Sequence, residues 1–268
     1  MRLVLVLVLM LMVLPLGGVK AQESRLQLLQ TGDDSRGWNA VGRLNLGDSG
    51  FCTGTLISPQ LVLTAAHCLY DKDSAALIPA SSIEFLAGWR NGRAEAYRGV
   101  RRAVVHPAYI YDAVDRLDRV ANDLAVLELD QPIRLPSISP FETDIRPAKG
   151  DEVGIVSYAK DRSEAPSLQQ LCHVLGRQPG VFVLSCDVDF GSSGAPIFSF
   201  RDGVARIVSV VSAKAEVEGR KVALGVALEQ PLTVLMAALD QSDPAFLHVG
   251  SKIRTLSGTS GGAKFVKP

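Results

Sequence analysis

Two adjacent serines, Ser192 and Ser193, stand between glycines in the stretch DFGSSGAPIF, residues 189–198. A serine hydroxyl is a weak nucleophile, and it attacks a carbonyl carbon only when a base accepts its proton and a third group orients that base. Small residues also cluster in ordinary turns, because glycine adopts backbone angles that other residues avoid. The stretch alone does not distinguish a reactive serine from a turn, so a base and an acid must be sought elsewhere in the chain.

The chain has four histidines, and the surroundings of His67 set it apart. In LVLTAAHCLY an apolar run leads through two alanines to His67 and Cys68, and the small residues leave space around the imidazole. His106 precedes a proline, His173 follows a cysteine in a predicted loop, and His248 follows a predicted C-terminal helix. We interpret these last three histidines as structural and His67 as the candidate base.

A candidate acid, Asp123, heads the apolar run in ANDLAVLELD. Aspartate is a poor strand former, so an aspartate that leads into a buried strand requires a partner there. The alternative interpretation is a turn or cap residue. Together with His67 and one of the two adjacent serines, Asp123 supplies the three residue types that nucleophilic acyl transfer needs.

The first residues have the layout of a secretory signal peptide. Arg2 precedes an apolar run of about 14 residues, and small residues end at Ala21, where we predict cleavage. The run is shorter than the roughly 20 residues that cross a bilayer, so an uncleaved anchor is the weaker alternative. Cleavage leaves a mature chain of 22–268 with a slight negative charge, which does not indicate a nucleic-acid partner.

Four cysteines, an even number, predict two disulfides in an exported chain. Three pairings are open, and we favour Cys52–Cys68 with Cys172–Cys186 because each closes a short loop. Zinc sites need closely spaced cysteine pairs, which these separations do not provide. No metal or cofactor is predicted.

Short strand-like runs separated by turn residues predict an all-β fold, rich in Val, Ile and Phe. Asp202-Gly203 between two such runs predicts a hairpin turn. Helical periodicity is clear only near residues 228–241. Residues 251–268, rich in glycine and serine near their start, are predicted to be disordered.

Four blocks, CTGTLISPQLVLTAAHC, NDLAVLEL, GSSGAP and IVSVVS, together resemble the trypsin/chymotrypsin-like serine proteases, in particular the bacterial secreted branch near the glutamyl endopeptidases. The resemblance implies two six-stranded Greek-key β-barrels packed together, followed by a short helix. It extends the protease domain over residues 22–250, with the boundary between barrels near 135–150. It also implies a secreted or periplasmic monomeric endopeptidase that acts on polypeptides and has no membrane anchor after signal cleavage.

The resemblance assigns roles to individual residues. Ser193 matches the nucleophile, and Gly191 and Ser193 match the donors of the oxyanion hole. His67 is then the general base and Asp123 the residue that orients it. Ser209, in IVSVV, matches a serine that supports the aspartate and lines the substrate channel.

The sequence departs from the trypsin pattern before the nucleophile, where Ser192 replaces an aspartate that pairs with a newly cut N-terminus. We therefore predict activity after signal removal, or after loss of a short segment such as 22–36, without a trypsin-type switch. Ala195, in place of glycine or serine, is small and should have little effect.

Specificity is less defined by the sequence. Asp187, six residues before Ser193, matches the acid that binds Arg or Lys, although a solvated or structural aspartate is the alternative. Val211 would narrow the pocket entrance. Val208 stands where glutamyl endopeptidases carry a histidine, which argues against glutamate and leaves a small or medium apolar residue open.

Two other functions compete with this interpretation. A catalytically inactive binding protein on the same fold would lack a triad residue, whereas all three are present. An α/β-hydrolase esterase would need the order serine, acid, histidine and alternating strands and helices, whereas the region after Ser193 is mostly β and holds His248 alone.

Overall fold

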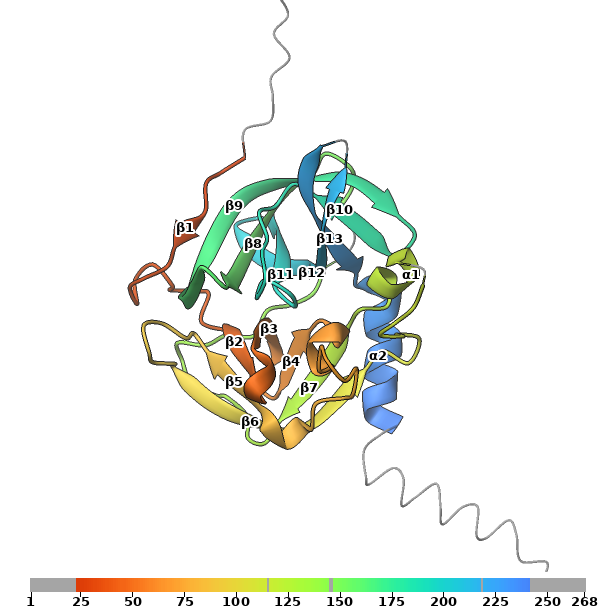
Figure 1. Cartoon of the computed structure of the whole chain (residues 1–268). Coiled ribbons are helices and arrows are strands. Elements are labelled where there is room, and N and C mark those ends of the chain that lie inside the picture. The colour runs from red at the N-terminus through yellow and green to blue at the C-terminus, as the bar shows by residue number, and fades with distance from the viewer. Residues whose placement is uncertain (1–22, 115, 145–146, 218, 242–268) are drawn as a thin grey trace, which may run out of the picture.

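The computed structural model describes residues 23–241, except for 115, 145–146 and 218. These residues form two β-barrels, which lie one below the other in Figure 1. The predicted signal-peptide cleavage site, the C-terminal segment predicted to be disordered, and His248 lie outside the described residues. The predicted all-β class with a short C-terminal helix is confirmed. None of the helices among the described residues is long and apolar enough to span a membrane.

The first barrel is closed by six antiparallel strands in the spatial order β2-β3-β4-β7-β6-β5. The strands are β2 (Val41–Leu46), β3 (Phe51–Ser58), β4 (Leu61–Thr64), β5 (Ile83–Ala87), β6 (Ala96–Val105) and β7 (Ala125–Leu129). Its loops carry the 3-10 turns η1 (Gly47–Ser49), η2 (Ala66–Leu69) and η3 (Ala80–Ser82) and the helix α1 (Arg116–Ala121). Branched and aromatic side chains fill its interior, among them Leu44, Leu56, Leu63, Phe85 and Leu127.

The second barrel has the order β9-β10-β13-β12-β11-β8, and β8 pairs again with β9 to close the ring. The strands are β8 (Glu152–Ala159), β9 (Arg162–Gln178), β10 (Val181–Leu184), β11 (Pro196–Arg201), β12 (Val204–Val217) and β13 (Arg220–Ala227). A short strand, β1 (Gln27–Leu28), adds to the outside of β9. The predicted two six-stranded barrels are therefore present, with β1 as an addition that the sequence pattern does not reveal.

The hairpin between β11 and β12 turns at Asp202 and Gly203, which both have positive φ, 54° and 73°. Two positive φ values in a two-residue loop are typical of a type I′ turn, so the turn predicted from Asp-Gly is confirmed. The pairing that we favoured for the cysteines is also present, since disulfides join Cys52 to Cys68 and Cys172 to Cys186.

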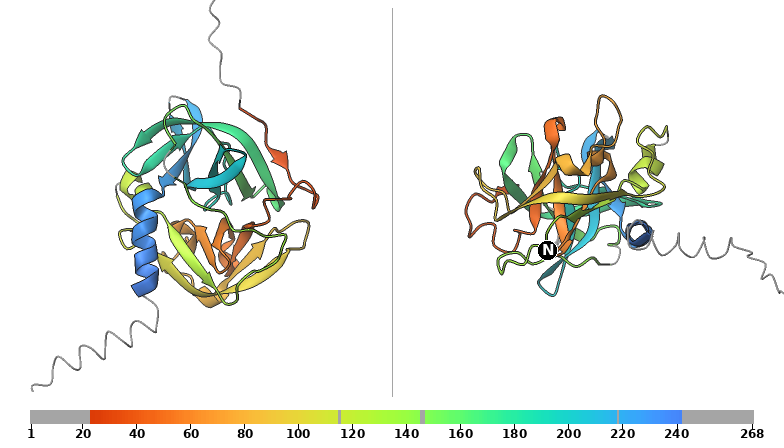
Figure 2. Two further views of the ribbon diagram at one scale, coloured as in Figure 1. Left: turned by 180° about the vertical axis from the view of Figure 1, so that it is seen from behind. Right: turned by 90° about the horizontal axis from the view of Figure 1, so that it is seen from below.

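Each barrel sends one helix against the other. The helix α2 (Glu229–Gln241) follows β13 of the second barrel, yet it packs along β6 and β7 of the first, as Figures 1 and 2 show. Its Leu235 and Leu239 are buried in the core shared with the first barrel. Conversely, α1 connects β6 to β7 of the first barrel along the chain, and it contacts β10 and β13 of the second barrel. The two helices fix how the barrels face one another.

Aromatic side chains also join the barrels. Trp38, just before β2, packs against Phe141 and Phe198 with ring centroids 5.8 and 5.2 Å away. Phe141 belongs to the segment that connects the barrels, and Phe198 lies on β11. Aromatic pairs at such separations contribute beyond the area that they bury, so this cluster stabilises the seam between the barrels.

Candidate active site

A cavity of about 310 Å³ is lined by residues of both barrels. The first barrel contributes His67 and Asp123, and the second contributes Ser193 and Ser212. His67 lies in η2 directly after β4, Asp123 lies between α1 and β7, and Ser193 lies in the loop that leads into β11. The structure thus brings the three residues singled out in the sequence to one cavity.

Asp123 is buried, with 2% of its surface exposed, and holds His67 at two points. Its Oδ1 accepts a hydrogen bond from the backbone N–H of His67 at 2.8 Å, and its Oδ2 lies 2.7 Å from His67 Nδ1. The carboxylate thereby places the proton of the neutral imidazole on Nδ1 and leaves Nε2 free to accept one. This is the arrangement that a general base requires.

A third hydrogen bond to Asp123 comes from Ser212 and not from Ser209. The Ser212 hydroxyl donates to Asp123 Oδ2 at 2.5 Å. The Ser209 hydroxyl is buried and has no hydrogen-bond partner among the described residues, and Ser209 does not line the cavity. The role predicted for Ser209 therefore belongs to Ser212.

A β-bulge explains this correction. In the pairing of β12 with β13, Val211 lies opposite Gly225 and Ala213 opposite Leu224, so Ser212 is the additional residue between them. A bulge redirects a side chain relative to strict alternation, and bulges are frequent beside active sites. The sequence IVSVVSAK contains the pattern Val-Ser twice, and the second copy was the signal for the correct serine.

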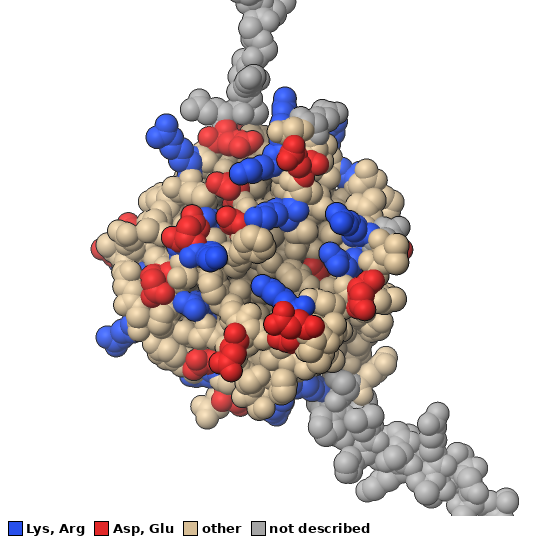
Figure 3. Space-filling model, viewed as in Figure 1, with Lys and Arg blue, Asp and Glu red and all other residues tan. Residues whose placement is uncertain are grey.

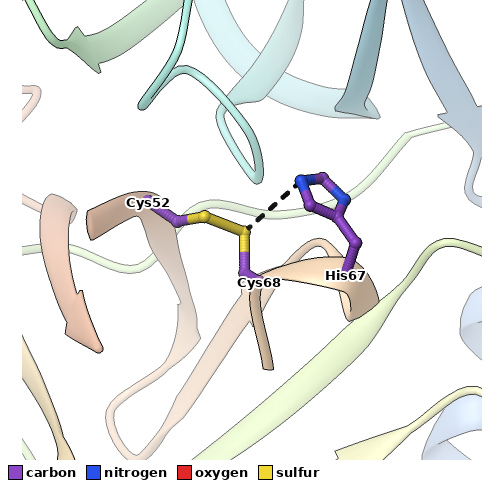
Figure 4. Close-up of side chains that lie close together, drawn as sticks. All are labelled: Cys52, His67 and Cys68. Carbon is purple, nitrogen blue, oxygen red and sulfur yellow. Dashed lines mark hydrogen bonds between the residues drawn. A yellow bond between two sulfur atoms is a disulfide. The ribbon is translucent and has the colours of Figure 1, made fainter. Parts of the chain in front are cut away.

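Ser193 is half-buried and lines the same cavity as His67. Within the described part of the chain no hydrogen bond joins its hydroxyl to His67, and His67 Nε2 lies 3.9 Å from Cys68 Sγ instead, as Figure 4 shows. Catalytic hydrogen bonds are often long without substrate and tighten when it binds. Cys52, His67 and Cys68 have potential metal-ligating atoms within 4.8 Å of one another, but both sulfurs are engaged in the disulfide, so no thiolate is available to a metal.

The backbone on either side of Ser192 has two free donors. Among the described residues, neither the Gly191 N–H nor the Ser193 N–H donates a hydrogen bond to the protein. Gly191 has a φ of +96°, and a Cβ there would lie 2.4 Å from the ring of Phe51, so only glycine fits. Its carbonyl accepts a hydrogen bond from Thr53 Oγ1 at 2.9 Å, which fixes the peptide. Two backbone N–H groups that lack a protein acceptor and lie beside a serine are the elements of an oxyanion hole.

Ser192 is fully buried and anchors this loop to the second barrel. Its hydroxyl donates to the carbonyl of Tyr158 at 3.2 Å, lies 3.3 Å from Ser157 Oγ, and accepts the backbone N–H of Asp189 at 3.3 Å. Neutral hydrogen bonds within the second barrel therefore support the loop at the position where the trypsin pattern has a charged pair. Ser192 is satisfied there and is not a competing nucleophile.

The residues predicted to set specificity have mixed outcomes. Val211 lines the cavity, as expected. Asp187 does not line it, and its side chain is exposed while its backbone N–H donates to Gln169 Oε1. Asp189, two residues further along, lines the cavity, and its carboxylate lies 2.7 Å from Lys214 Nζ. The hydrogen bond from Lys214 lowers the pKa of the Asp189 carboxyl.

An aromatic wall, which the sequence did not reveal, lies on the His67 side of the cavity. Tyr70 and Tyr111 are stacked with ring centroids 4.9 Å apart, and Tyr109 lies 5.8 Å from Tyr70. Burial, with a smaller contribution from the charge of Asp123, raises the pKa of Tyr109 far above its ordinary value, so this phenol stays neutral. The wall offers apolar and aromatic surface to a bound chain.

Charges elsewhere on the visible face are mixed. Figure 3 shows lysine and arginine side chains interspersed with aspartate and glutamate, without a broad area of one sign. The equal numbers of basic and acidic residues, 28 of each, agree with this distribution. Recognition at the cavity therefore depends on the particular side chains that line it.

Comparison with solved structures supports the fold. The chain is similar to a Glu endopeptidase solved in complex with MPD, with a TM-score of 0.63 and 20% identity, over 75% of this chain and 90% of the other. At this identity the likeness establishes the fold. The chymotrypsin-like architecture expected from the sequence is therefore confirmed.

Curated relatives resemble parts of the chain. It is 25% identical to a glutamyl endopeptidase of Bacillus licheniformis over 150 residues, 56% of this chain and 45% of the relative. It is 37% identical to a trypsin of Simulium vittatum over 147 residues, 48% of this chain and 54% of the relative. It is 26% identical to venom serine protease 34 of Apis mellifera over 112 residues, 40% of this chain and 27% of the relative. The chain thus spans about a quarter to about half of each relative.

The sequence profile of the Trypsin family matches residues 31–178, which is more than half of the chain. The match includes His67 and Asp123 and ends before Ser193. The structure supplies the remaining segment, since β10 to β13 complete the second barrel and bring Ser193 to the cavity. From the profile and the fold together, the chain belongs to the trypsin family of serine proteases.

Proposed function

We propose that this protein is a serine endopeptidase that hydrolyses peptide bonds through an acyl-enzyme, with Ser193 as nucleophile, His67 as general base and Asp123 as the residue that orients His67. The observation that carries the proposal is the hydrogen-bonded group of His67, Asp123 and Ser212 beside Ser193 in one cavity. Polypeptides are the proposed substrates.

In the first half of the reaction, Ser193 Oγ attacks the scissile carbonyl carbon while His67 Nε2 accepts the hydroxyl proton. The imidazolium that forms is held by the Asp123 carboxylate, which is already bonded to Nδ1 at 2.7 Å. His67 then donates the proton to the leaving amine, and the acyl group remains on Ser193. In the second half, water attacks the ester with His67 again as base, and the acid product and free Ser193 are released.

The free N–H groups of Gly191 and Ser193 support stabilisation of the oxyanion in both halves. Each donor in such a hole contributes about 2.7–4 kcal/mol to transition-state stability in enzymes where it has been removed. Because the carbonyl of Gly191 is held by the Thr53 hydroxyl, little reorganisation of this peptide is needed during the reaction.

We also propose that no trypsin-type activating cleavage is needed. The loop around Ser193 is supported by the neutral hydrogen bonds of Ser192, which need no new N-terminal amine. Residues near the N-terminus of the described chain pack against the second barrel, since β1 pairs with β9 and Leu29 is 1% exposed. Removal of residues 22–36 would therefore cost contacts, and we expect the form that retains them to be the active one. A secreted monomer is part of this proposal, and the two disulfides support secretion.

The test is labelling of purified residues 22–268 with a fluorophosphonate, which reacts with activated serines. We expect stoichiometric labelling of the parent without prior proteolysis, none of Ser193→Ala, and full labelling of Ser199→Ala, a matched change at a buried serine of β11. The test is complete if the parent and Ser199→Ala, which are expected to be labelled, hydrolyse a mixed peptide library and Ser193→Ala does not.

Each other result has a clear meaning. An unlabelled parent that becomes reactive after limited cleavage would overturn the claim about activation and keep the triad. A folded parent that neither labels nor cleaves under any condition would favour the alternative function, a binding protein on a protease fold. Label on Ser193→Ala would remove Ser193 as the nucleophile.

A further inference from the structure

The charges that line the cavity are unbalanced once the triad is set aside. Within the described part of the chain, three cationic side chains line it, those of Lys72, Arg119 and Lys214. Two carboxylates do so, and Asp123 already accepts three hydrogen bonds within the triad. Asp189 is thus the remaining acid of the lining, and it is bound to Lys214. Among the described residues of the lining, a basic substrate side chain therefore finds no unpaired acid.

Lys214 connects two segments that border Ser193. It lies on β12, two residues after Ser212, and its Nζ contacts Asp189 at 2.7 Å and lies 4.0 Å from the ring centroid of Phe190. Asp189 and Phe190 precede the oxyanion glycine directly. The ammonium therefore sits next to the nucleophile loop, with one carboxylate and one aromatic face as its partners.

The Lys214–Asp189 pair is suited to exchange. The side chains of both residues are 49% exposed, and ion pairs at this exposure are weak because water screens them. The Asp189 carboxylate also accepts the backbone N–H of Phe190 at 2.8 Å, so it keeps a partner when Lys214 leaves. Phe190 is 63% exposed and can cover a ligand bound to Lys214, which strengthens a charged hydrogen bond by excluding water.

We propose that Lys214 determines specificity by binding an acidic side chain of the substrate residue that donates the scissile carbonyl, the P1 residue, in exchange for Asp189. The inference rests on the proposed peptidase function and adds its substrate class. It departs from the expectation against glutamate drawn from Val208, because Val208 is buried in the second barrel and does not line the cavity. Val188, Val211 and Ala213 line the same cavity and would contact the methylene groups of that side chain. A P1 lysine or arginine would place a second cation beside Lys214 and is disfavoured.

The experiment uses residues 22–268, with active sites counted by fluorophosphonate titration, and four peptides that differ only at P1: Glu, Gln, Leu and Lys. We expect kcat/KM for Glu to exceed that for Gln by about ten- to a hundredfold, the range of a charged hydrogen bond. Lys214→Ala should remove this ratio, whereas Lys214→Arg should keep most of it. Asp189→Asn should raise kcat/KM for Glu, because the internal competitor has lost its charge.

Lys221→Ala is the matched control, an exposed lysine on β13 that does not line the cavity, and it should leave the Glu/Gln ratio unchanged. A parent that prefers Lys or Leu, or a Lys214→Ala variant that titrates fully and keeps the Glu/Gln ratio, would overturn the inference while the peptidase function stands. A parent that fails to react with the fluorophosphonate at Ser193 would instead remove the proposed function on which the inference depends.

Discussion

Replacement of Ser212 by alanine tests the role that the structure gives to a serine outside the expected position. The Ser212 hydroxyl is buried and donates to Asp123 Oδ2, the same oxygen that binds His67 Nδ1. Alanine removes this donor, and the burial of Asp123 at 2% exposure prevents bulk water from replacing it. The carboxylate then holds the imidazole through the two bonds to His67 alone.

The size of the effect follows from the chemistry of the lost bond. A hydrogen bond to a charged group contributes about 1.5–3 kcal/mol, and about 1.4 kcal/mol of transition-state energy changes a rate tenfold. We therefore expect Ser212→Ala to lower kcat/KM by about ten- to a hundredfold, mostly through kcat, because Asp123 acts on His67 and not on the substrate. The same loss should lower the melting temperature by about 3–12 °C for a domain of this size.

Ser209→Ala is the matched control on the same strand. The Ser209 hydroxyl is buried without a partner, so its removal should leave kcat/KM within about twofold and stabilise the fold slightly, since an unsatisfied buried hydroxyl carries a desolvation penalty. The assay is hydrolysis of a fluorogenic peptide. The rate of each variant is divided by its concentration of active sites, and it is measured about 15 °C or more below the melting temperature of that variant.

Two results would refute this reasoning. Ser212→Ala with kcat/KM within about threefold of the parent would mean that the bond to Asp123 contributes little to catalysis. Equal losses in Ser212→Ala and Ser209→Ala would mean that β12 tolerates no change and that the bond to Asp123 is not the cause.

Four further changes have defined outcomes. Gly194→Ala should destabilise the fold by about 2–5 kcal/mol in urea unfolding and abolish fluorophosphonate labelling, because Gly194 has a φ of +78° and a Cβ would lie 2.2 Å from a backbone carbonyl oxygen. Gly203→Ala, with φ +73° and open space, should cost about 1–2 kcal/mol and keep labelling; equal costs would contradict the packing argument. Burial lowers the pKa of His106 below 6.5, so its contribution to stability is present above pH 6.5 and is lost as pH falls through the lower folded value. His106→Gln should flatten the fall in unfolding free energy between pH 7.5 and 5, and an unchanged slope would argue against this. Replacing Cys172 and Cys186 by alanine opens a loop of separation 14 and should cost about 3 kcal/mol in urea, with a loss below about 1 kcal/mol as the contrary result.

Features that depend on neighbouring residues were predictable from the sequence. The Asp202-Gly203 turn requires two positive φ values that this pair adopts readily, and it formed as predicted. The C-terminal helix follows from an amphipathic stripe over about 13 residues, and α2 begins at Glu229, one residue after the predicted start. His67 and Asp123 could be identified in the same way, because each lies in a short block whose residue types set it apart from the rest of the chain.

Features that depend on register were not predictable. Matching the motif IVSVV to the family pattern gave Ser209, whereas the bulge at Ser212 changes which side chain faces Asp123. Counting back from Ser193 gave Asp187, whereas the loop directs Asp189 to the cavity. Neither a bulge nor a loop path has a strong local signal, because both arise from pairing with segments distant in sequence.

The exchange of helices between the barrels has a consequence for how the protein forms. The core of the first barrel includes Leu235 and Leu239, which are among the last described residues of the chain. During synthesis from the N-terminus, that barrel therefore lacks part of its packing until nearly the whole chain is available. In the other direction, Gly180 of the second barrel accommodates Ala121 of α1 so closely that a Cβ at Gly180 would lie 2.7 Å from it. Neither half completes its packing without the other, so a fragment that ends before α2 should not acquire a stable cavity.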